Sequence, residues 1–122
     1  MKNIIKKIST MVLGASLLVA TMGVTAMAAS GNIYGSLNGT YGSVTLQNTS
    51  GNIRYCVITL RQYNSSESNY STVSANSGNL SSGNTITTSG PVYDTHAVGV
   101  GYIYNSGSSN SGVALTKKTY IK

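Results

Sequence analysis

Residues 52–63, NIRYCVITLRQY, constrain the fold of this chain more than any other segment. They form its longest run dense in β-branched and aromatic residues, and neither glycine nor proline interrupts them. Because side chains alternate across a strand, Tyr55 and Val57 point to one face while Ile58 and Leu60 point to the other. Both faces are apolar in the middle of the run and charged toward its ends. The pattern predicts a central strand that is covered on both sides.

A hairpin is predicted just before this run, where two alternating segments flank Asn38-Gly39. Asn-Gly favours a two-residue type I′ loop because both residues tolerate a positive φ. Such a loop places Ile33 opposite Val44. One face of the hairpin then collects the aliphatic side chains of Ile33, Leu37, Val44 and Leu46.

The residue pattern of the remaining chain predicts further short strands separated by polar turns. They fall at 70–75, 85–88, 95–104 and 113–121, with loops at 76–84 and 105–112 and a turn at Gly90-Pro91. The side chains expected to face inward from these segments are Val73, Leu80, Val113, Leu115 and Ile121. Gly99 and Gly101 share a face of one strand, which predicts either the close approach of a second layer or a tyrosine ring lying over them.

Together these segments predict an all-β fold. Six or seven strands with a turn about every ten residues favour a small antiparallel β-sandwich, and a partly closed β-barrel is the alternative. No helical periodicity follows the N-terminal segment.

The first 28 residues have the features of a cleavable secretory signal-peptide helix. Three lysines precede an apolar run at 11–24, and Ala26-Met27-Ala28 matches an A-x-A cleavage site. The run is short and interrupted by glycine and threonine, which disfavours an uncleaved membrane anchor. We therefore expect a bacterial-type signal peptide at 1–28 and one domain at 29–122. With no lipid-attachment cysteine after the cleavage site and no wall-sorting tail, we expect the domain to be secreted without a lipid or covalent wall anchor.

Groups able to carry catalysis are scarce in residues 29–122, which hold one histidine, one cysteine and two carboxylates. Glu67 and Asp94 could form a glycosidase pair, but they are more simply read as solvated carboxylates. Asp94 and His96 share a strand face and could activate Cys56, yet a mid-strand thiol among apolar neighbours is normally buried and inert. We therefore predict no catalytic residues and no cofactor. We predict no closed metal site either, although calcium held by loop carbonyls and Asp94 stays an open alternative.

The remaining candidates are basic and aromatic. Five basic and two acidic side chains give residues 29–122 a net charge of +3, too little and too scattered for nucleic-acid binding. Lys117, Lys118 and Lys122 either protect a sheet edge or attract anionic wall polymer or lipid. Tyr34 and Tyr41, diagonal neighbours in the predicted register, either form a stabilising cross-strand pair or stack on sugars and partners. These five residues are the predicted binding site.

The function that this composition favours is that of a small secreted, non-enzymatic β-sandwich protein. It would act by surface contact with a cell envelope or a partner protein, with self-association as a further option. A secreted antibacterial, bacteriocin-like or toxin-like protein is the main alternative, since small size, export and positive charge suit that role as well. A hydrolase that uses Cys56 and His96 is the third reading.

Overall fold

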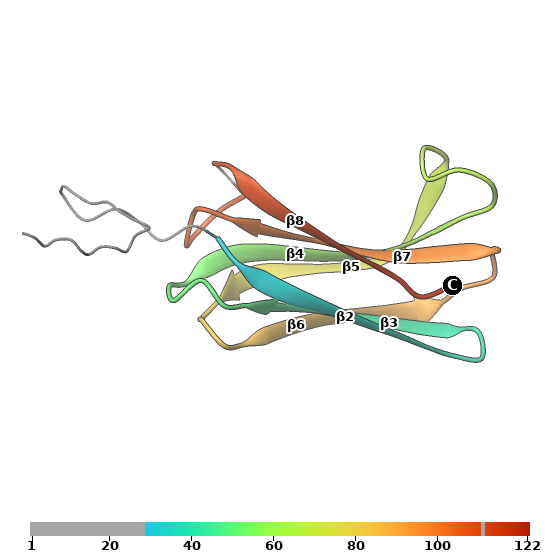
Figure 1. Ribbon diagram of the computed structural model, residues 1–122, viewed down its shortest axis with the longest axis horizontal. Helices are drawn as coiled ribbons and strands as arrows, with labels where there is room; N and C mark the ends of the chain where they lie inside the picture. The colour runs from blue at the N-terminus through green and yellow to red at the C-terminus, as the bar shows by residue number, and fades with distance from the viewer. Residues whose placement is uncertain (1–28, 111) are drawn as a thin grey trace, which may run out of the picture.

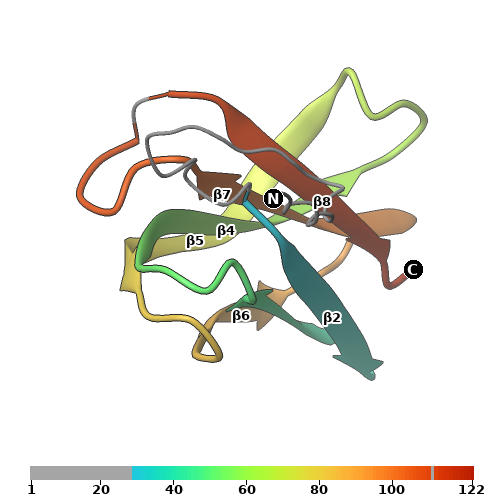
Figure 2. The ribbon, with the colours of Figure 1, turned by 60° about the vertical axis from the view of Figure 1, so that its left-hand side comes forward.

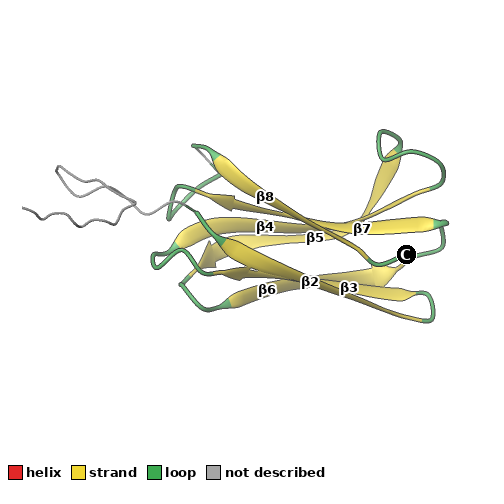
Figure 3. Cartoon of the chain, in the orientation of Figure 1, coloured by secondary structure: helices red, strands yellow, loops and turns green. Residues whose placement is uncertain are grey.

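The computed structural model describes residues 29–110 and 112–122, and the predicted signal peptide at 1–28 lies outside them. Seven strands run through the described residues, which contain no helix (Figure 3). The strands are β2 (Gly31–Asn38), β3 (Tyr41–Asn48), β4 (Arg54–Tyr63), β5 (Tyr70–Leu80), β6 (Thr85–Pro91), β7 (His96–Tyr104) and β8 (Ala114–Tyr120).

The strands form two open antiparallel sheets that stack face to face (Figures 1 and 2). One sheet has the order β2-β3-β6 and the other β5-β4-β7-β8. The predicted β-sandwich is confirmed, and the barrel alternative is wrong. Constant-type immunoglobulin domains place strands one, two, five and four in one sheet. Here the fourth strand, β5, lies instead beside the third strand in the other sheet.

The hydrophobic core lies between the sheets. Val44 and Leu46 point inward from β3, and Cys56, Ile58 and Leu60 point inward from β4, all with 0% of their surface exposed. These side chains occupy every second position of their strands, so the predicted inward face of β3 is confirmed, and on β4 the face of Ile58 and Leu60 is the one that points into the core.

The inner face of β7 is flat because it carries two glycines. A Cβ atom on Gly99 would lie 2.5 Å from Val44 Cγ1, and one on Gly101 would lie 2.7 Å from Leu46 Cδ1. Both distances are far below van der Waals contact, so a side chain at either position would force Val44 or Leu46 to move. Of the two readings of these glycines, the close approach of a second layer is confirmed.

β4 is an interior strand with β5 on one side and β7 on the other. Its outer face is also covered, because Thr59 is 7% exposed and the neighbouring Val98 and Val100 of β7 are 2% and 1% exposed. The prediction of a central strand covered on both faces is confirmed. The outer cover comes from side chains of the same chain rather than from a third layer.

The first hairpin forms, but its loop begins one residue later than predicted. Asn38 pairs with Tyr41, so the loop is Gly39-Thr40, and Ile33 pairs with Leu46 instead of Val44. Gly39 has a φ of 63° at the first loop position, a conformation that glycine adopts without the steric cost of a Cβ atom. The inward face is unchanged, because the partner of each residue moves by two positions and alternate side chains share a face.

Two other strands are longer than predicted. β5 continues through 76–80, which the polar composition assigned to a loop, because these residues pair with β4 along its whole first half. β6 includes Gly90 and Pro91, which the sequence assigned to a turn. Pro91 ends an edge strand, where proline is tolerated.

The inward-facing predictions outside the first hairpin hold with one exception. Val73, Leu80, Leu115 and Ile121 are half-buried against the core. Val113 lies before β8 and is 75% exposed, because the strand starts one residue later than the predicted one.

One end of the sandwich is closed by a buried polar side chain. Asn48 is 0% exposed, and its Nδ2 donates to the carbonyl oxygens of Asn52 at 2.8 Å and Leu80 at 2.7 Å. Its Oδ1 accepts from the main-chain N–H of Ser50 at 2.9 Å. Asn48 therefore ties together the two turns that follow β3 and β5.

Candidate functional site

The outer face of the β5-β4-β7-β8 sheet collects most of the aromatic side chains in the chain. Residues paired across antiparallel strands share a face, so the pairings show which side chains of β5, β7 and β8 lie on the same face as the outward side chains of β4. Six of the nine tyrosines belong to this surface. We call it the tyrosine face, and its tyrosines are Tyr55, Tyr63, Tyr70, Tyr102, Tyr104 and Tyr120.

Ring contacts run across the tyrosine face from β4 to β7. The ring centroids of Tyr55 and Tyr104 are 6.0 Å apart, and those of Tyr104 and Tyr102 are 6.4 Å apart. The interplanar angles of 52° and 35° correspond to tilted pairs, which suit the quadrupoles of the rings. All three rings are half-buried, so each keeps an edge or face in solvent.

Arg61 continues this row of rings toward β5. Its Nη2 donates to the hydroxyl of Tyr102 at 3.2 Å, and its guanidinium carbon lies 4.3 Å from the ring centroid of Tyr70. A guanidinium over a tyrosine ring contributes about 0.5–2 kcal/mol. Its Nε is buried and has no hydrogen-bond partner among the described residues. Arg61 thus links the rings of β5 and β7 across β4.

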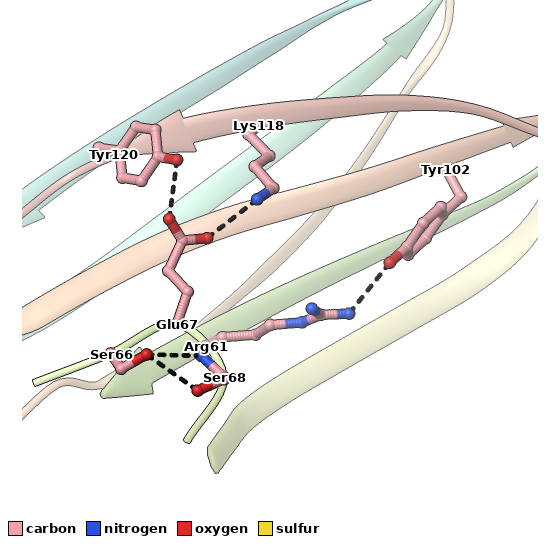
Figure 4. A network of polar contacts seen from close by, with 7 residues as sticks. All are labelled: Arg61, Ser66, Glu67, Ser68, Tyr102, Lys118 and Tyr120. Atoms are coloured by element: carbon pink, nitrogen blue, oxygen red, sulfur yellow. Dashed lines mark hydrogen bonds and ion pairs between the residues drawn. The ribbon is translucent and has the colours of Figure 1, made fainter. Parts of the chain in front are cut away.

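A loop closes the other end of the tyrosine face. Residues 64–69 connect β4 and β5, and Glu67 from this loop reaches β8 at the far edge of the sheet (Figure 4). Its carboxylate accepts from Lys118 Nζ at 2.9 Å and from the Tyr120 hydroxyl at 3.0 Å. Within the loop, the main-chain N–H of Ser68 donates to Ser66 Oγ at 3.2 Å, which shapes the turn.

These contacts change the ionisation of the three groups involved. The hydrogen bonds from Lys118 and Tyr120 lower the pKa of the Glu67 carboxyl. The hydrogen bond that Lys118 donates to Glu67 raises the pKa of Lys118, and the hydrogen bond that Tyr120 donates to Glu67 raises the pKa of its phenol. At neutral pH the site therefore holds a charged Glu67–Lys118 pair beside a neutral phenol.

A second apolar cluster lies under this loop. Tyr63 stacks on His96 with centroids 5.0 Å apart and planes 23° from parallel, and Tyr63 is only 9% exposed. Val98 and Val100 pack against Tyr63 in the same cluster. By contrast, Tyr70 and Tyr120 at the margins are 44% and 59% exposed. The tyrosine face therefore has a packed base and two open aromatic margins.

The tyrosines that the sequence singled out lie elsewhere. Tyr34 and Tyr41 are 53% and 56% exposed on the outer face of the other sheet. In the observed register Tyr34 pairs with Thr45, four residues along β3 from Tyr41, or about 14 Å. The predicted diagonal contact between Tyr34 and Tyr41 is therefore wrong, for the same reason that the loop position was wrong. Tyr34 instead donates to Gln47 Oε1 at 3.3 Å.

The three predicted lysines are divided between surfaces. β8 is an edge strand, as the edge-protection reading of its lysines requires. Lys118 lies on the tyrosine face, whereas Lys117 points to the opposite side of β8 and is half-buried. Lys122 follows the strand and is exposed. Only Lys118 among them belongs to the polar network of Figure 4.

The groups considered for catalysis are kept apart. Cys56 points into the core, where burial raises the pKa of its thiol to about 11. His96 lies on the outer face and pairs with Tyr63, seven residues along β4 from Cys56, or about 23 Å. The two side chains therefore cannot act together as nucleophile and base. Glu67 is ion-paired rather than simply solvated, which corrects that reading of the sequence.

Neither a metal cluster nor a membrane helix appears in the part of the chain that the structure describes. No three His, Cys, Asp or Glu side chains lie together there. No helix among residues 29–110 and 112–122 is long and apolar enough to cross a membrane.

The tyrosine face was accessible to sequence reasoning only in part. The alternation of 52–63 and 95–104 puts Tyr55 and Tyr63 on one strand face and Tyr102 and Tyr104 on another. The alternation does not show that β4 pairs with β7. This pairing joins the outer faces of the two strands into one surface. The Glu67 contact gave no signal at all, because it joins a loop to a strand 51 positions away.

No protein-family model and no curated protein sequence matches this chain. Among solved structures it is similar to a β-glucosidase from Listeria innocua in complex with glucose, with 12% identity, a TM-score of 0.39 and 76% of this chain covered. It is also similar to β-glucosidase 3B from Thermotoga neapolitana, with 12% identity, a TM-score of 0.38 and 83% of this chain covered. The chain spans 16% and 18% of the lengths of those two chains.

Proposed function

We propose that this chain is a secreted, non-enzymatic binding module that contacts a cell envelope or a partner protein through its tyrosine face. The observation that carries the proposal is the gathering of six of the nine tyrosines on one sheet face, with Tyr70 and Tyr120 open at its margins. Tyrosine offers a large contact area and a polar end while losing little side-chain entropy on binding, which makes it frequent at recognition surfaces.

The surroundings of these rings support contact rather than chemistry. Arg61 is fixed by Tyr70 and Tyr102, and Lys118 is fixed by Glu67, so the polar groups of the face are held in place before any partner arrives. Fixed side chains lower the entropy cost of association. The signal-peptide features at 1–28 support export, which would bring this surface to the cell envelope.

The experiment is a sedimentation assay with purified residues 29–122. Whole bacterial cells, isolated cell walls and anionic liposomes are each mixed with the protein and pelleted, and the bound fraction is measured. We expect retention on one of the three, and a loss of at least tenfold in affinity for the variant Tyr70→Ser/Tyr120→Ser. No retention on any of them, together with inhibition of growth of related strains, would favour the antibacterial alternative.

A further inference from the structure

Among the described strands, β2 forms one edge of its sheet and pairs only with β3. The main-chain N–H of Thr49 donates to the carbonyl oxygen of Ser30 at 2.9 Å, which continues the β2–β3 register. In an antiparallel ladder the hydrogen-bonded pairs recur at every second residue. The even-numbered residues of β2 therefore bond to β3. The odd-numbered ones direct their N–H and C=O groups away from the sheet, and they are Gly31, Ile33, Gly35 and Leu37.

This edge is open to solvent around Gly35, whereas Gly31 at its start is buried. Gly35 is exposed even though Ile121 and Thr119 occupy the space that its side chain would need. The accessible part of Gly35 is therefore its main chain at the sheet edge. Ile33 and Leu37, on either side of it, are only half-buried. Among the described residues, the outward main-chain groups of β2 thus run beside a strip of partly exposed aliphatic side chains.

The two neighbouring edges on the far side of the sandwich are protected against such pairing. The outward carbonyl oxygens of Thr87 and Ser89 in β6 accept from Asn76 Nδ2 at 3.1 Å and Ser74 Oγ at 2.9 Å. β5 carries a bulge at Val73, where the register with β4 shifts. Side-chain cover and bulges are two of the devices that prevent edge-to-edge association.

β8, the remaining edge, carries Lys117 and Lys118. β2 has the sequence GNIYGSLN, with no charge and no proline, and its register with β3 is regular over all eight residues. It is the one edge among the described strands without any of these protections. An unprotected, uncharged edge strand is a template for the addition of another strand.

We infer that β2 is the site at which two copies of this chain pair, edge to edge and antiparallel, into a two-fold symmetric dimer. Only a register that joins odd-numbered residues to odd-numbered residues satisfies the outward main-chain groups. A two-fold axis at Gly35 meets this condition and sets Ile33 against Leu37 of the second copy in both directions. The second copy is the favoured occupant because β2 is uncharged and complementary to itself under this axis.

The dimer is weak and leaves the proposed binding surface free. About six main-chain hydrogen bonds and one short strand fall below the area of a standard interface, so we expect weak association. β2 belongs to the sheet that lacks the tyrosine face. The inference therefore does not depend on the proposed function, and its test measures mass rather than ligand binding.

The test is analytical ultracentrifugation of residues 29–122 between about 10 μM and 1 mM. In the inferred register Tyr34 lies opposite Ser36 of the second copy. The variant Tyr34→Lys/Ser36→Lys places like charges opposite each other twice, and it should raise the dissociation constant at least tenfold. The variant Tyr34→Lys/Ser36→Glu places opposite charges there and should dimerise at least as well as the unmodified protein.

Thr116→Lys on the exposed outer face of the β8 edge is the control, and it should leave the dissociation constant unchanged. Circular dichroism verifies that each variant is folded. A monomer at every concentration would overturn the inference and leave β2 to an extended segment of another protein. A dimer that survives the double-lysine substitution, that is lost in the lysine–glutamate variant, or that is lost in Thr116→Lys would also overturn it.

Discussion

Lys118 on the last strand donates to Glu67 at 2.9 Å, which joins β8 at one edge of the four-stranded sheet to the connection between β4 and β5. Glu67 belongs to the loop beside β5 at one edge, and Lys118 belongs to β8 at the other. The pair therefore fixes the 64–69 loop over the end of the tyrosine face. Removing it should loosen that loop without affecting the core, where neither side chain takes part.

The first prediction concerns pH. The pKa of Glu67 is lowered in the folded protein, so its stabilising contribution is present above its ordinary pKa of 4.5 and is lost as the pH falls through the lowered value. The pKa of Lys118 is raised, so its contribution is present below 10.5 and is lost as the pH rises through the raised value. Glu67→Gln should remove the acid-side part of this dependence and lower the melting temperature at pH 7 by a few degrees at most.

Thermal melts from pH 3 to pH 8 measure this effect. Asp94→Asn, which removes the other carboxylate of residues 29–122, is the matched control and should retain the acid-side loss seen in the unmodified protein. Identical pH profiles for Glu67→Gln and the unmodified protein would show that the ion pair does not form in solution.

The second prediction concerns the spacing of the sheets. Gly101→Ala would put a methyl group 2.7 Å from Leu46 Cδ1, and such overpacking costs about 1–3 kcal/mol. Gly78→Ala in β5 is the control, because nothing lies within 4 Å of its added Cβ atom and Gly78 has no positive φ. Urea unfolding should show a large loss for the first and no loss for the second. Equal stabilities would mean that the sheets are farther apart than described.

Much of this architecture could be predicted because two-residue alternation is a strong signal. It placed Val44 and Leu46 on the core face, and it put Ile58 and Leu60 together on one face of a covered strand, which is the face that points into the core. The same signal cannot fix a hairpin loop to the residue, since moving the loop from Asn38-Gly39 to Gly39-Thr40 leaves every side chain on its predicted face. The misplaced loop changes which residues of the two strands lie opposite each other, and it therefore separates Tyr34 from Tyr41.

The candidate site was harder to predict because it depends on which strands become neighbours. Polar residues 76–80 have the composition of a loop, yet each of them pairs with a residue of β4. This tertiary pairing overrides their weak strand propensity. Tyr102 and Arg61 meet only because β7 lies beside β4. Local sequence carries no information about that choice of partner.

The third prediction concerns Cys56. Its thiol is fully buried with a pKa of about 11, so a thiol reagent at pH 8 should label it only when the protein unfolds. Because the folded state favours the neutral thiol, this group stabilises the fold below pH 9.0, and that contribution is lost as the pH rises toward about 11. Rapid labelling of the native protein would place Cys56 at the surface and reopen its use as a nucleophile.

Binding through the tyrosine face is tested most sharply by comparing two pairs of tyrosines of similar exposure in the envelope-binding assay. Tyr70 and Tyr120 lie on the tyrosine face, and Tyr34 and Tyr41 lie on the other sheet. We expect Tyr70→Ser/Tyr120→Ser to lower the affinity at least tenfold, whereas Tyr34→Ser/Tyr41→Ser should change it less than twofold. Equal losses for the two tyrosine pairs, or a loss confined to Tyr34→Ser/Tyr41→Ser, would contradict binding through the tyrosine face.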